Sequence, residues 1–74
     1  MNREVILKQL HQPGPLVVRT SDGNEFSVPH HEVVFVGRYN VAIEDERGGM
    51  DILDPLHIVS IRPSARRKMR KNGH

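Results

Sequence analysis

Apolar residues near the start of the chain recur at helical spacing, and polar residues separate them from the next apolar segment. The side-chain oxygen of Asn2 can accept a hydrogen bond from the first turn, and Pro13-Gly14-Pro15 ends the pattern. The spacing predicts a helix over residues 3–11. A helix this short is marginal in water, so we expect it to cover the open end of a barrel. Its apolar side contains Val5, Ile6, Leu7 and Leu10.

From residue 16 onwards the apolar period changes to two, which is typical of strands with one buried face. Residues 16–21 and 24–28 both alternate, and Asp22-Gly23 between them favours a hairpin turn with positive φ. Pro29 cannot donate to a strand ladder, so we expect the chain to change direction over residues 29–32. Leu16, Val18 and Thr20 share one face of the first strand, and Phe26 and Val28 of the second are expected to face the core.

Four further segments have strand character. Residues 33–36 are apolar, and in residues 39–44 the side chains of Tyr39, Val41 and Ile43 share one face. A turn at residues 46–49 leads to a short strand at residues 50–53. Asp54 and Pro55 then predict a single helical turn before the last strand, at residues 58–61, because Asp is a good cap and Pro fits the first helical position.

The order of segments is a helix, about five short strands and one tight turn before the last strand. Many short antiparallel strands around a small core favour a closed or nearly closed sheet, because closure hides the strand edges. We therefore expect a mainly β protein. Its predicted fold is a small SH3-like or Sm-like five-stranded antiparallel barrel with a short N-terminal α-helix, formed by residues 1–62 and followed by a basic, disordered tail at residues 63–74.

Charge is divided unevenly along the 74 residues. Residues 1–61 contain five Lys/Arg and all nine Asp/Glu, a net charge of −4, whereas residues 62–74 carry six Lys/Arg and no acid. With no cysteine, the chain has no disulfide, no thiol nucleophile and no Cys-based zinc site. No apolar stretch approaches the roughly 20 residues that span a bilayer. These features predict a cytoplasmic protein that does not enter membranes.

Two segments resemble known proteins. DGNEFSVPHHEVVFVG, followed by DPLHIVSI, is similar to a set of small uncharacterised bacterial proteins with the pattern Asp-Gly, Phe, Val-x-His-x-Glu and then Asp-Pro-Leu-His-Ile. The chain also resembles Sm-like barrels, in which a helix precedes five strands. Leu56-His57-Ile58-Val59-Ser60 lies where the bacterial Sm-like RNA chaperone has Lys-His-Ala-Ile-Ser, so Leu56 replaces the lysine. The resemblance implies a fold and leaves the activity open.

The adjacent histidines His30 and His31, followed by Glu32, suggest a metal site. In an extended segment the two histidines point to opposite faces, so both reach one ion only if the bend after Pro29 turns them together. His57 could complete such a set in space. The alternative is a structural corner lined by polar side chains. No other spacing matches a catalytic motif, so we expect neither an enzyme nor a bound cofactor.

The C-terminal basic run is the clearest functional signal, because clustered Arg and Lys neutralise phosphates and release counterions. Two hypotheses follow. The favoured one is a non-catalytic interaction or assembly module that pairs its strand edges with another protein or with itself. The alternative is an RNA- or DNA-binding protein that uses its basic tail, and metal binding at the His30/His31 corner is a third. The expected nucleic-acid-binding residues are Arg62, Arg66, Arg67, Lys68, Arg70 and Lys71.

Overall fold

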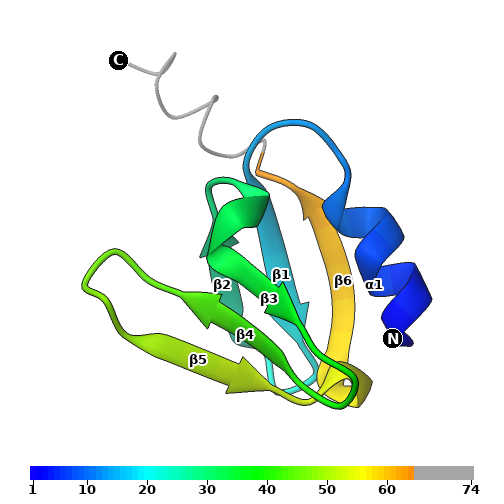
Figure 1. Ribbon diagram of the computed structural model, residues 1–74. Coiled ribbons are helices and arrows are strands. Elements are labelled where there is room, and N and C mark those ends of the chain that lie inside the picture. Colours follow the sequence, from blue (N-terminus) through cyan, green and yellow to red (C-terminus); the bar gives the residue numbers. More distant parts are fainter. Residues whose placement is uncertain (65–74) are drawn as a thin grey trace.

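The computed structural model describes residues 1–64, which form one N-terminal helix and six strands (Figure 1). The helix α1 spans Arg3–Leu10, and its predicted cap is confirmed because the Val5 amide donates to Asn2 Oδ1 over 2.8 Å. Ile6 and Leu10 are buried, whereas Val5 is exposed. The face that α1 turns to the core is therefore narrower than the sequence pattern predicts.

The first sheet has the strand order β2-β1-β6 and is antiparallel throughout. It consists of β1 (Leu16–Thr20), β2 (Glu25–Val28) and β6 (Ile58–Pro63). The hairpin between β1 and β2 is confirmed, with Gly23 at a φ of 91°, where a side chain would be strained. Of the two side chains predicted to face the core, Val28 is buried, whereas Phe26 is half-buried and packs against the core.

A corner separates the first sheet from the second, as predicted around residues 29–32. The 3₁₀ turn η1 (His31–Val33) follows Pro29 and leads into β3 (Val34–Val36), β4 (Val41–Glu44) and β5 (Met50–Leu53), which form an antiparallel sheet in that order. The predicted helical turn before the last strand is η2 (Pro55–His57), capped by Asp54, which accepts from the Leu56 amide over 2.9 Å.

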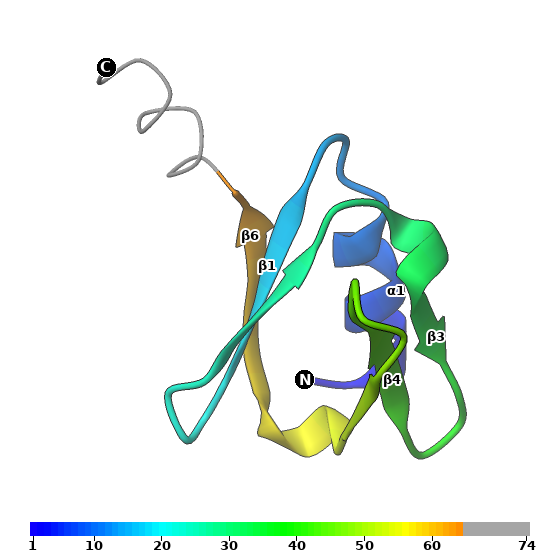
Figure 2. The ribbon, with the colours of Figure 1, turned by 90° about the vertical axis from the view of Figure 1, so that its left-hand side faces the viewer.

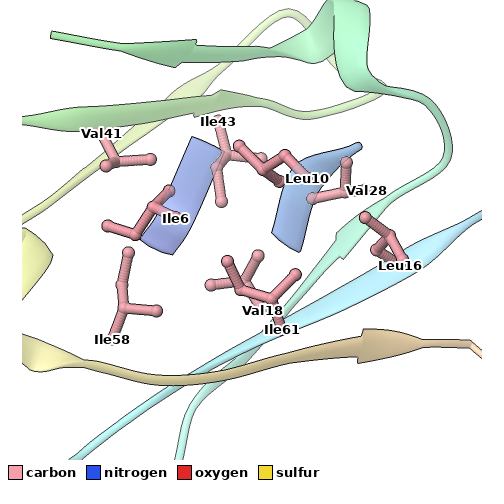
Figure 3. Packing of buried hydrophobic residues seen from close by; sticks show 9 residues of the cluster. All are labelled: Ile6, Leu10, Leu16, Val18, Val28, Val41, Ile43, Ile58 and Ile61. Atoms are coloured by element: carbon pink, nitrogen blue, oxygen red, sulfur yellow. The ribbon is translucent and has the colours of Figure 1, made fainter. Parts of the chain in front are cut away.

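The core lies between the two sheets, with α1 across the gap between them (Figure 2). Side chains from α1 and from strands of both sheets converge there (Figure 3). Burying this apolar surface is the main favourable contribution to folding in a chain of this size. The nine buried apolar residues are Ile6, Leu10, Leu16, Val18, Val28, Val41, Ile43, Ile58 and Ile61.

The predicted five-stranded barrel needs correction in its strand count. Within residues 1–64 the chain forms six strands in two three-stranded sheets, and these sheets do not close into one barrel. Pro29 and the η1 turn interrupt the ladder where one strand would otherwise run from the first sheet into the second. The last strand also continues to Pro63, where Pro63 pairs with Leu16, so it extends beyond the predicted end at residue 61.

Tyr39 was predicted to lie in a strand and to share its face with Val41 and Ile43, and this prediction is wrong. Its side chain is 75% exposed, and β4 begins only at Val41. The Gly37 amide donates to the Asn40 carbonyl over 2.8 Å, which closes a bend over residues 37–40 and leaves Tyr39 in the loop. A local backbone hydrogen bond has overridden the alternation of apolar residues.

Candidate functional site

The outward side of the second sheet is apolar. Directly opposed residues on antiparallel strands share a face, and buried Ile43 and Val41 pair with Asp51 and Leu53, so these four face inward. The alternate residues consequently face outward, and Phe35, Ala42 and Ile52 lie in one row across the three strands. Met50 lies on the same side of β5. We call Phe35, Ala42, Met50 and Ile52 the apolar face, and Glu44, which pairs with Met50, borders it on the same side.

Three of the four side chains of the apolar face are large, hydrophobic and exposed. Phe35 and Met50 are each 51% exposed and Ile52 is 65% exposed, while Ala42 between them is half-buried. The outward side of the first sheet has a different character, because Arg19 lies between Glu25 and Ser60, and Val17 between Ser27 and Arg62. The outward surface of the second sheet is therefore more apolar than that of the first sheet. A contiguous exposed apolar patch of this kind is typical of an interaction surface.

The apolar face ends at an open strand edge. β5 is the last strand of its sheet in the described residues, and β4 is its neighbour on one side only. The edge of the first sheet at β6 differs because α1 packs beside it, and the Gln12 side chain donates to the Ile61 carbonyl over 3.3 Å. An exposed strand edge presents backbone donors and acceptors that a further strand can pair with. β5 therefore combines an apolar face with a pairing edge.

A groove of about 690 Å³ separates β2 from the hairpin that joins β4 and β5. Its floor is apolar and includes Phe26, Val33 and Ile43. Five acidic residues also contribute to its lining, and Arg47 is the one Lys/Arg residue from residues 1–64 there. We call this feature the acidic groove. Its five acidic residues are Glu25, Glu44, Asp45, Glu46 and Asp51.

The histidine corner does not form a metal centre in the described residues, where no group of three or more His, Asp or Glu side chains is placed to hold an ion. His30 Nδ1 lies 3.8 Å from Glu32 Oε1, and both side chains are largely exposed. His30, His31 and His11 line a second groove, between the end of α1 and β3, without converging on one point. His57 lies elsewhere, so the proposed ligand set is not brought together.

Sequence patterns did not reveal that Ser21 and His57 meet. Ser21 Oγ lies 3.3 Å from His57 Nδ1, and the Ser21 amide donates to the His57 carbonyl over 2.8 Å. Both side chains are exposed, and within residues 1–64 no carboxylate hydrogen-bonds to the other ring nitrogen of His57. Activation of a serine needs a histidine that is oriented by such a third group. The pair instead ties the β1–β2 hairpin to η2.

Of the predicted nucleic-acid-binding residues, the structure describes Arg62, whose exposed side chain lies on the outward side of β6. Arg66, Arg67, Lys68, Arg70 and Lys71 lie outside the described residues. Among residues 1–64, no helix is long and apolar enough to cross a membrane.

Comparisons with protein-family models, with curated proteins and with solved structures find no match to this chain. The geometry of the apolar face, the β5 edge and the acidic groove is accordingly the basis for assigning a function.

Proposed function

We propose that this protein is a non-catalytic assembly module that pairs with a second copy of itself along the β5 edge. The observation that carries the proposal is the coincidence of an open strand edge with an apolar row formed by Phe35, Ala42 and Ile52. Pairing through β5 satisfies the backbone groups of the edge and places two apolar faces side by side. The surrounding fold is, in this proposal, a partly open SH3-like or Sm-like barrel, supported by the element order of helix, strands and 3₁₀ turn before the last strand.

The register of the proposed pairing follows from the side-chain pattern of β5. When two identical strands pair antiparallel, their apolar faces form one continuous surface only if each outward-facing residue lies opposite an outward-facing residue of the other copy. Pairing Ile52 with Ile52 of the second copy meets this condition and places Asp51 opposite Leu53. A register centred on Asp51 would oppose two carboxylates, which is destabilising. The Ile52-centred register is therefore favoured, and it extends the apolar row across both copies.

The proposal predicts a concentration-dependent mass that depends on Ile52. Ile52→Lys places a charge at the centre of the pairing edge, and charged side chains are the device by which edge strands resist pairing. We expect self-association weaker by at least about tenfold, or about 1.4 kcal/mol. Light scattering of the full chain over a range of concentrations measures this. Val59→Lys is the matched control, because Val59 is 53% exposed but lies on β6.

A monomeric mass for the unmodified chain at every concentration would rule out assembly through β5. Equal loss of association in Ile52→Lys and Val59→Lys would show that charge anywhere on the surface, and not the β5 edge, decides the oligomeric state. Circular dichroism of both variants checks that the fold is retained, and the exposure of both side chains leads us to expect that it is.

The charge distribution favours a second candidate function, binding of RNA or DNA by the basic C-terminal residues. Six Lys/Arg and no acid occur in residues 62–74, and phosphate contacts by such residues release counterions. Titration of a fluorescent oligonucleotide at two salt concentrations tests this, with the full chain and a variant in which five basic residues are replaced by Gln. Steep salt dependence that the replacements abolish would support it, whereas absence of binding at low salt would contradict it. The replaced residues are Arg66, Arg67, Lys68, Arg70 and Lys71.

A further inference from the structure

We propose that the acidic groove is a docking site for residues 66–71 of the same chain. The proposal does not depend on β5 pairing, because the groove is lined by the inward-facing Ile43 and Asp51 of the second sheet, whereas the apolar face lies on its outward side. The groove is bordered by β2, by the corner after it and by the β4–β5 hairpin, whose tip is visible apart from the first sheet in Figure 1. Both the chemistry of the groove and its position favour residues 66–71 as the segment that binds there.

The chemistry of the groove complements that of the segment. Five acidic residues line the groove together with an apolar floor, in which Phe26 is only half-buried. The segment Arg66-Arg67-Lys68-Met69-Arg70-Lys71 has five positive charges, no acid and one flexible apolar side chain. Lys and Arg lay their aliphatic stems along apolar surface while keeping their charges near carboxylates, and Met adapts to irregular apolar surfaces. A ligand without apolar groups would contact the acidic residues and leave the apolar floor of the groove exposed.

Asp45 already accepts hydrogen bonds from the Arg47 and Gly49 amides over 2.9 Å, so it is held in place by the hairpin turn. Glu44, Glu46 and Asp51 project from the same hairpin and are exposed. Like charges gathered on one hairpin repel each other, and a cationic segment between them and β2 relieves this repulsion.

The described end of the chain lies close to the groove. Pro63 pairs with Leu16, which pairs with Val28 on its other side, so β6 ends two strand spacings, or about 10 Å, from the end of β2. The Ser64 amide donates to the Pro15 carbonyl over 2.9 Å and fixes this exit point. Pro29 and His30, which follow Val28, line the groove. Figure 2 shows the end of β6 and the η1 corner at the same end of the molecule.

The length of the chain after Ser64 is sufficient for docking within one molecule. Residues 65–71, when extended, reach up to roughly 23 Å, about twice the separation between the ends of β6 and β2. A tethered segment is present near its site at an effective concentration in the millimolar range, which a second molecule in dilute solution does not match. We therefore assign the groove to the segment of its own chain.

If residues 66–71 dock in the groove, occupancy of the groove is linked to the binding of any other partner by the same residues. A phosphate-rich ligand and the groove carboxylates compete for the same Arg and Lys side chains. Binding of such a ligand then releases the groove, and neutralising the groove strengthens binding of the ligand. The groove carboxylates act as an internal competitor.

Paramagnetic broadening in the full chain tests the proposal. The sequence has no cysteine, so Asn72→Cys gives a single attachment point for a nitroxide label. We expect amide signals from the groove residues 25–27, 44–47 and 51 to be broadened at low salt, and the broadening to be lost at high salt. In Glu44→Gln/Glu46→Gln the broadening at the groove should also be lost. The matched control, Glu4→Gln/Glu32→Gln, removes the same charge from outside the groove lining and should retain it.

Mixing ¹⁵N-labelled chain without nitroxide and unlabelled chain with nitroxide separates docking within a molecule from docking between molecules. The proposal requires that the mixed sample show no broadening at the groove. Broadening in the mixed sample would assign the groove to the segment of a second copy and overturn the proposal. Absence of groove broadening in the singly labelled chain, or its retention in Glu44→Gln/Glu46→Gln, would also overturn it.

Discussion

Single aspartates hold three of the turns in this protein. Asp22 accepts from the Thr20 hydroxyl and from the Asn24 amide, Asp45 accepts from two amides of the β4–β5 turn, and Asp54 caps η2. Asp is favoured at such positions because its short side chain reaches the backbone of its own turn. These carboxylates have structural roles, although Asp45 also contributes charge to the acidic groove.

The Thr20 hydroxyl and then the Asn24 amide hold the pKa of Asp22 below its ordinary value of 3.8. Because the folded state favours the charged carboxylate, its contribution to stability is complete above the unfolded pKa. The contribution is lost as the pH falls through the lower, folded pKa. We expect the carboxyl carbon of Asp22 to titrate in NMR spectra with a midpoint below 3.8, and Thr20→Val to move that midpoint upward. An unchanged midpoint in Thr20→Val would contradict the assigned cause.

At the scale of elements, β6 connects most of the molecule. It pairs with β1, lies beside α1 and follows η2 directly, so it joins elements from both ends of the chain. The first residue of β6 and the η2 turn before it could be predicted from Asp54, Pro55 and the apolar spacing of Ile58 and Ile61. The last residue of β6 could not be predicted, because Arg62 is polar and Pro63 is a residue that normally interrupts strands. Their place in the strand depends on pairing with Val17 and Leu16.

This pairing predicts different stabilities for two truncations. A chain that ends at residue 61 loses the pairing of Arg62 and Pro63 with β1, and also the hydrogen bond from Ser64 to Pro15. A chain that ends at residue 64 keeps all of them. At about 1 kcal/mol for each hydrogen bond, we expect the shorter chain to be less stable by about 1–2 kcal/mol. Urea unfolding measures the difference, and equal midpoints would show that β6 contributes nothing beyond Ile61.

For the whole molecule, assembly and folding stability should be linked. A partner that binds the folded chain but not the unfolded one raises the apparent stability with concentration. The thermal midpoint of the unmodified chain should therefore rise as its concentration rises, and the midpoint of Ile52→Lys should not. Scanning calorimetry at several concentrations measures both. A midpoint that is independent of concentration in the unmodified chain would argue against assembly through β5.

The amino-acid sequence alone determined the local features: the Asn2 cap, the Asp22-Gly23 turn, the Pro29 corner and the η2 turn. Each depends on a backbone preference or a hydrogen bond within a few residues. Only the tertiary structure decided which way Phe35 faces, since residues 33–36 are all apolar and their period is ambiguous. It also placed Glu25, Glu44 and Asp51 in the lining of one groove, and brought Ser21 beside His57. These contacts join residues far apart in the chain, and they follow from how two sheets bury one shared core.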